Sequence, residues 1–210
     1  ASLYPEPVHV LVRADGPLQS ITDLRGKRVN LGLPGSASRL TALAVLAAHG
    51  LQPEDLGAVA ALDLQQGLTA LRDGELDALV QIIGAPADNI RAASESFALR
   101  LLPLQASAIS RLQQERPGSF AFTLPAGTYP QQKAGLPTLA VSSLLLTSGQ
   151  LTSREVEQLV RLLFSLDSPW LQYGSIQGTQ LSPDNAQRGL GVPLHEGAEK
   201  ALQALKPPAG

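Results

Sequence analysis

The first half of the sequence alternates short apolar runs with segments of helical periodicity. Gly- and Pro-containing turns separate them, and the connections are short. Strands that alternate with helices are typical of a parallel sheet flanked by helices. We therefore predict an α/β fold. The expected strands are 7–14, 29–33, 56–62, 76–83 and 98–104, and the expected helices between them are 38–48, 65–74 and 86–96.

The second half of the sequence has a different pattern. Two extended runs, 120–124 and 136–147, flank the Pro/Gly-rich stretch PAGTYPQQKAG and predict long crossing strands. Thr152 and Glu155 then form a capping box that opens an amphipathic helix. A last short helix is expected near 196–205. Trp170 and Tyr173 could form an exposed aromatic patch, although a lone tryptophan is more often part of the core.

Composition excludes several classes of function. Apolar residues make up 44% of the 210 residues and charged residues 16%, which is a globular composition. The formal net charge of −2 offers no basic face for nucleic acid. The absence of cysteine excludes disulfides, thiolate metal sites and cysteine nucleophiles. Because the chain contains no methionine, we expect a processed product or a piece of a longer protein.

The stretch VNLGLPGSASRLTALAVLAAHG, residues 29–50, carries the clearest candidate binding site. An apolar run ends in Gly35, Ser36, Ala37 and Ser38, and a helix is expected at once. A helix start leaves N–H groups unpaired and is electropositive, and small residues let an anion approach the backbone. Arg39 could add a guanidinium group. The alternative is an ordinary strand–helix turn with a serine N-cap.

Catalytic and metal-binding patterns are not found in the sequence. The turn at 34–39 is neither a Walker loop nor a dinucleotide fingerprint, and no nucleophile elbow or HExxH motif occurs. The three histidines, His9, His49 and His195, lack the spacing of metal ligands. We therefore expect a protein that is not an enzyme and that has neither a cofactor nor a metal.

A succession of phrases resembles one family of receptors. LYPEPVHVLVRAD, ITDLRGKRVNLGLPGSASRLTA, ALRDGELDALVQIIGAP, LPAGTYP and GVPLHEGAEK occur in the same order as in the TAXI group of periplasmic solute receptors, which serve tripartite TRAP transporters. The family's Gly-Ser-Gly-Thr is Gly-Ser-Ala-Ser here. The resemblance also implies that the front third of the family's length is absent, so that the chain is a fragment or a shortened relative.

The resemblance implies a type II periplasmic-binding-protein fold, with two α/β lobes joined by crossing strands and an incomplete first lobe. Ligand would lie in a cleft that closes by a hinge motion. The implied divisions are 1–22 for part of the first lobe and the first crossover, 23–122 for the second lobe, 123–146 for the return crossover strands, and 147–210 for C-terminal helices that pack on the first lobe.

Further ligand contacts are expected at the ends of strands and in one loop. Gln81, Gly84, Ala85 and Pro86 end a buried strand, and the carboxyl ends of strands face the ligand crevice in open α/β sheets. A plain turn is the alternative. Thr128 and Tyr129 in LPAGTYP could contact ligand or fix their loop, and Tyr4 in LYPEP is a similar candidate.

These arguments predict an extracytoplasmic protein that works in the periplasm. The chain would capture a small anionic solute, an amino acid such as glutamate or another carboxylate, and deliver it to the permease subunits of a TRAP transporter. The alternative is a ligand-sensing domain of a signalling protein, and a third hypothesis is a hydrolase or transferase on the same fold. An incomplete lobe would expose apolar surface, so the missing N-terminal segment or an exchanged dimer is an expected partner.

Overall fold

The computed structural model describes residues 1–165 and 176–205. Trp170 and Tyr173, the candidate aromatic patch, lie outside these residues. The chain divides into two compact units, one formed by 6–140 and the other by 1–5 with 141–210. The lobe boundaries at residues 22, 122 and 146 stay a prediction. In the part of the chain that the structure describes, no helix is long and apolar enough to cross a membrane.

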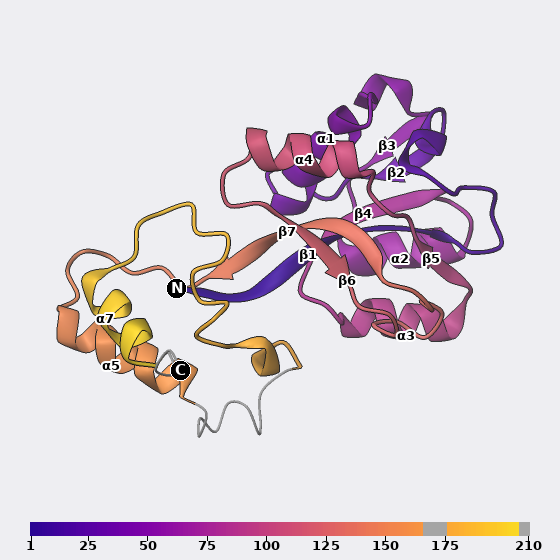
Figure 1. The fold of residues 1–210 in the computed structure, drawn as a ribbon. Helices are drawn as coiled ribbons and strands as arrows, with labels where there is room; N and C mark the ends of the chain where they lie inside the picture. The colour runs from indigo at the N-terminus through magenta and orange to yellow at the C-terminus, as the bar shows by residue number, and fades with distance from the viewer. Residues whose placement is uncertain (166–175, 206–210) are drawn as a thin grey trace. The chain divides into compact units, whose positions relative to one another are not determined.

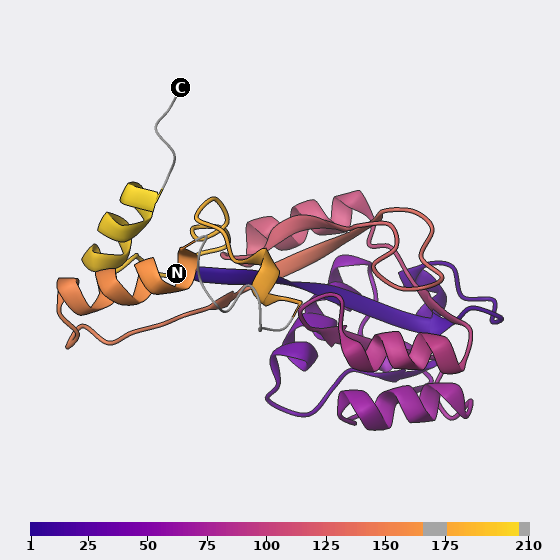
Figure 2. The ribbon, with the colours of Figure 1, turned by 90° about the horizontal axis from the view of Figure 1, so that it is seen from below.

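A mixed, open sheet organises the chain (Figure 1). Its strand order is β3-β2-β4-β1-β7-β6, and β5 pairs with β1. Figures 1 and 2 show β1 and β7 as long strands that lie side by side, and each runs from one unit into the other. The α/β fold expected from the sequence is thereby confirmed. The strands are β1 Ser2–Arg13, β2 Arg28–Asn30, β3 Ala58–Ala60, β4 Ala78–Ile82, β5 Leu99–Leu101, β6 Phe120–Leu124 and β7 Leu136–Leu144.

The expectation of a parallel sheet is correct only for part of it. β2 pairs in parallel with β3 and with β4. By contrast, β1 is antiparallel to β4 and β5, and β6 is antiparallel to β7. A parallel pair needs a crossover, usually a helix, and the described connection between β6 and β7 contains no helix, which fits their antiparallel pairing. β1 is not a neighbour of β2, because β4 lies between them in the sheet.

The helices cover both faces of the sheet in the unit 6–140. α1 and α4 lie on one face, and α2 and α3 lie on the other (Figure 1). The core beneath α2 and α3 includes Leu11, Leu79 and Leu101, which are almost inaccessible to solvent. The α-helices are α1 Ala37–Ala48, α2 Leu64–Arg72, α3 Asp88–Ser96, α4 Ala106–Glu115, α5 Ser153–Phe164 and α7 Glu196–Leu205.

Helix α4 was not predicted from the sequence, where residues 105–119 were expected to form neither a helix nor a strand. Ala108, Ile109 and Leu112 are buried at helical spacing. Gln105 occupies the N-cap position and makes no side-chain capping hydrogen bond there. The usual start signal of a helix is therefore absent, and the burial of one apolar stripe against the sheet stabilises the segment instead.

The unit formed by 1–5 and 141–210 is built around α5 and α7. The Thr152 hydroxyl accepts a hydrogen bond from the Glu155 amide, and the Glu155 carboxylate accepts one from the Thr152 amide, which confirms the predicted capping box. At the start of α7, His195 Nδ1 accepts from the Gly197 amide. The buried core of this unit consists of Val156, Val160, Phe164, Ala186, Ala198, Ala201 and Leu202.

Candidate functional site

The loop between β2 and α1 folds back over the start of the helix. Gly32 and Gly35 have φ values of +89° and +77°, a conformation that residues with a Cβ rarely adopt. A Cβ on Gly32 would lie 3.2 Å from the Ser38 Cβ and 3.3 Å from the Ser36 Oγ. Gly32 is therefore required both for its backbone conformation and for the close approach of the loop to α1.

Ser36 is the N-cap of α1, as the sequence indicated. Its hydroxyl oxygen accepts from the Arg39 amide at 3.1 Å, and its O–H donates to the Leu33 carbonyl at 2.7 Å. The Leu40 amide donates to the Ser36 carbonyl at 3.2 Å. These bonds pair the backbone amides of the third and fourth helical residues, Arg39 and Leu40. The amides of the first two helical residues are not paired by them.

The amides of Ala37 and Ser38 donate to no residue among those the structure describes. Gly35 and Ala37 are exposed to solvent, so a ligand can reach the backbone at this point. Two free N–H groups at the positive end of a 12-residue helix form an arrangement that suits an anion.

The side chains of Ser38 and Arg39 are partly engaged by the protein. The Ser38 hydroxyl is buried, with the residue 8% exposed, and accepts a hydrogen bond from the Ile82 amide at 3.3 Å. This bond fixes the start of α1 to the end of β4. Arg39 Nη1 donates to the Gly32 carbonyl at 3.3 Å, and Arg39 forms no ion pair with the described residues. Its charge therefore stays beside the turn.

Asn30 holds the loop in place and was not singled out by the sequence analysis. It is buried at the end of β2, where its side-chain oxygen accepts from the Gly32 and Leu62 amides at 3.2 and 2.9 Å. Its Nδ2 donates to the Leu62 carbonyl at 3.2 Å. A polar residue between Val29 and Leu31, in a run expected to form a buried strand, was the available signal.

The end of β4 places the second group of predicted residues near the same turn. Gln81 pairs with His9 across the sheet, and its side-chain amide donates to the Ile82 carbonyl at 3.2 Å. Gly84 is buried, and the Ala85–Pro86 peptide bond is cis. Since Ser38 contacts Ile82, the structure brings the turn at 34–39 and the end of β4 together.

Tyr129 is almost completely buried, with 2% of its surface exposed. His9 Nδ1 lies 2.9 Å from the Pro7 carbonyl, so Nδ1 carries the proton and Nε2 is an acceptor. The Tyr129 hydroxyl therefore donates to His9 Nε2 at 2.8 Å and accepts from the Ala87 amide at 3.2 Å. Burial lowers the pKa of His9 to about 4 and raises the pKa of Tyr129 to about 12, so both rings are neutral near pH 7.

Thr128 and Tyr4 make no side-chain hydrogen bond to this group among the described residues. The Thr128 hydroxyl donates to the Pro125 carbonyl at 2.7 Å, within its own turn. Tyr4 belongs to the other compact unit. The ligand roles of Thr128, Tyr129 and Tyr4 stay predictions. Among the described residues, no group of three or more His, Asp or Glu side chains gathers as a metal site would require.

Comparison with models of known protein families identifies the family of this chain. The model of the NMT1-like family matches residues 1–203, which is almost the whole chain. The chain belongs to the NMT1-like family. The narrower resemblance to the TAXI group stays a prediction for this NMT1-like chain.

Solved structures of binding proteins are similar to this NMT1-like chain at low identity. The periplasmic sulfonate-binding protein SsuA of Methylobacillus flagellatus is 15% identical, with a TM-score of 0.48 over 86% of this chain and 47% of that one. The aliphatic sulphonate binding protein SsuA of Escherichia coli is 17% identical, with a TM-score of 0.47 over 98% of this chain and 57% of that one. The arginine-binding protein of T. maritima is 14% identical, with a TM-score of 0.35 over 68% and 47%. The chain thus spans about half the length of these structures.

Proposed function

We propose that the chain is part of an extracytoplasmic solute-binding protein and that the start of α1 holds the acidic group of a small solute. The observation that carries this proposal is the pair of free amides at Ala37 and Ser38 in an exposed turn. Membership of the NMT1-like family supports it, and so does the use of the similar structures as binding proteins for sulfonates and amino acids.

The position of the turn in the sheet also supports the proposal. The loop at 31–36 leaves the carboxyl end of β2, and the segment 83–87 leaves the carboxyl end of the parallel neighbour β4. Ligands of open α/β sheets bind outside the carboxyl ends of parallel strands. The two loops would therefore supply one side of the site, with Gln81 and Pro86 as further contacts.

The chemistry of the turn favours a carboxylate or a related oxyanion. The two amides would donate to the anionic oxygens, and the guanidinium of Arg39 beside Gly32 would add a favourable charge. A small amino acid or organic acid carries such a group. We propose a TRAP-type permease as the acceptor of the solute, on the strength of the phrases LYPEP, LPAGTYP and GVPLHEGAEK. A TRAP permease gene beside the gene for this protein would support that choice, and a transporter ATPase gene would contradict it.

The test is a thermal-shift screen against amino acids, dicarboxylates and oxoacids, followed by Ser36→Asp and its matched control Ser36→Asn. A ligand that binds only the folded state raises the melting temperature. Asp and Asn cap helices about as well as Ser, so both variants should fold. Ser36→Asp places a negative charge beside the amides of Ala37 and Ser38 and should abolish the shift. Ser36→Asn should keep most of it.

Two results would contradict this assignment. If the ligand-induced shift survives in Ser36→Asp, the acidic group is bound elsewhere. If the shift is lost equally in both variants, the hydroxyl of Ser36 and not the charge at the helix start decides binding.

A further inference from the structure

A second cavity lies beside the end of β1, where Arg100 of β5 pairs with Val12, whereas the carboxyl end of β4 pairs with Val8 in the middle of β1. It has a volume of about 370 Å³. α3, β5 and the segment 129–136 that precedes and begins β7 form its walls. Pockets for small molecules commonly have volumes of about 300–1,000 Å³, so this cavity is large enough for one.

The charged residues that line the cavity are both cations, Arg100 and Lys133. Neither forms an ion pair with the described residues. Asp15, the carboxylate of the turn that follows β1, is already paired with Arg13 at 2.7 Å. Arg91 of α3 adds positive potential nearby, because its charge acts to lower the pKa of Tyr129 against the larger effect of burial. The cavity thus has cationic groups without a matching carboxylate in its lining.

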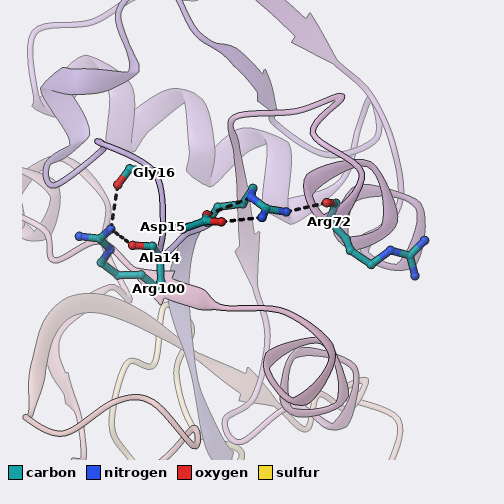
Figure 3. Close-up of polar contacts among 6 residues, drawn as sticks. Ala14, Asp15, Gly16, Arg72 and Arg100 are labelled. Carbon is teal, nitrogen blue, oxygen red and sulfur yellow. Dashed lines mark hydrogen bonds and ion pairs between the residues drawn. The ribbon is translucent and has the colours of Figure 1, made fainter.

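Only one of the three guanidinium nitrogens of Arg100 donates hydrogen bonds to the described residues. Its Nη2 donates to the Ala14 carbonyl at 2.5 Å and to the Gly16 carbonyl at 3.0 Å (Figure 3). Its Nε is buried and has no hydrogen-bond partner in the described part of the chain, and its Nη1 donates to no described residue. Gln132 lines the same cavity, and its buried Oε1 is also without a partner there.

The unpaired Arg100 Nε and Gln132 Oε1 have almost no accessible surface, so they lie behind the wall of the cavity and not in it. The Arg100 Nη1 is not among the buried unpaired atoms, and it has no partner in the described part of the chain. A bound oxyanion would supply acceptors for this Nη1 and a counter-charge for Lys133. We infer that this cavity is a second binding site, for a small molecule that carries a phosphate, sulfonate or carboxylate group.

The second site is separate from the one proposed at α1. Arg100 pairs with Val12 of β1, whereas Ile82, which contacts Ser38, pairs with Val8. Four residues of strand correspond to about 13 Å. In addition, α3 and α1 cover opposite faces of the sheet (Figure 1). Tyr129 lines the cavity and also accepts from the Ala87 amide beside Pro86. The two sites are therefore tested separately by variants that leave Tyr129 in place, Ser36→Asp for the first and Lys133→Gln for the second.

The experiment is a titration of the full chain with inorganic phosphate, followed in ¹H–¹⁵N spectra at constant ionic strength. We expect saturable shifts of the Arg100 Nε–H signal and of the amides of 131–135. Lys133→Gln, at an exposed position, should weaken phosphate binding about tenfold, which is the usual effect of losing one charge-assisted hydrogen bond. Arg111→Gln on α4 is the matched control, because it removes one exposed positive charge outside the cavity and should leave binding unchanged.

Acetate and methanesulfonate, titrated in the same way, distinguish the possible acidic groups, and the dianionic phosphate should bind most tightly because two cations line the cavity. Shifts that do not saturate, or equal weakening in Lys133→Gln and Arg111→Gln, would overturn the inference. Loss of the phosphate-induced shifts at Arg100 and 131–135 in Ser36→Asp would also overturn the inference, because phosphate binding would then depend on the start of α1. Retention of the shifts in Ser36→Asp supports the second site, whatever the outcome for the solute proposed at α1.

Discussion

Tyr129 shows how one side chain fixes three parts of the chain. Its hydroxyl joins His9 on β1 to the Ala87 amide that precedes α3, in a buried and neutral arrangement. Such a group stabilises the fold chiefly because the penalty for leaving its partners unpaired is large. The local sequence LPAGTYP indicated a turn with a tyrosine, but it could not identify a histidine 120 residues away as the partner.

Tyr129→Phe should lower the free energy of unfolding by roughly 1–3 kcal/mol, because the Ala87 amide and His9 Nε2 would lose their partner in a buried position. Urea unfolding at neutral pH measures the change. Tyr4→Phe is the matched control, since the Tyr4 hydroxyl makes no hydrogen bond to the described residues, and its effect should be close to zero. Equal effects of the two substitutions would show that the buried hydrogen bonds of Tyr129 contribute nothing to stability.

Helices α5 and α7 depend on a close contact that only glycine permits. A Cβ on Gly197 would lie 2.1 Å from the Ser153 carbonyl oxygen and 2.9 Å from the Glu157 amide nitrogen. These are backbone atoms of α5, so they cannot move aside as a flexible side chain would. The pairing of the two helices, and with it the core formed by Val160 and Leu202, is therefore set by a residue without a side chain.

Gly197→Ala should destabilise the chain by roughly 1–3 kcal/mol or more, the usual cost of overpacking. Alanine favours helix formation by about 1 kcal/mol relative to glycine, but that gain is smaller than the expected cost of the overlap. Thermal unfolding measures the difference. Gly191→Ala is the control, because a Cβ at that position would meet open space. A melting temperature for Gly197→Ala at or above that of the wild type would refute the close-contact argument.

For the whole molecule, the buried His9 couples stability to pH. Its pKa is lowered from 6.5 to about 4 by burial in the folded state, whereas an unfolded chain restores the ordinary value. Above pH 6.5 neither state binds the proton, and the contribution to stability is complete. Between pH 6.5 and about 4 the unfolded state gains the proton first, so the folded state loses stability as the pH falls.

We expect a loss of up to roughly 3 kcal/mol across this range from His9, since one pKa unit corresponds to about 1.4 kcal/mol. Urea unfolding of the wild type and of His9→Gln at several pH values measures this loss. The quantity to compare is the slope of the free energy of unfolding against pH, because other groups titrate in both proteins. His49, whose pKa is also lowered by burial, is among these groups. Parallel curves for the two proteins would show that His9 binds a proton in the folded state as readily as in the unfolded one.

The sequence by itself determined the features that depend on neighbouring residues. The alternation of strands and helices, the Ser36 N-cap and the capping box at Thr152 were all predictable, because periodicity and capping act within one or two helical turns. Tertiary structure decided the direction of β1, the formation of α4 and the position of the loop held by Asn30. It also decided the pairing of Tyr129 with His9 and the meeting of Arg100 and Lys133 in one cavity. These features join segments far apart in the chain, and their stability comes from burial and hydrogen bonds that exist only after the segments have packed together.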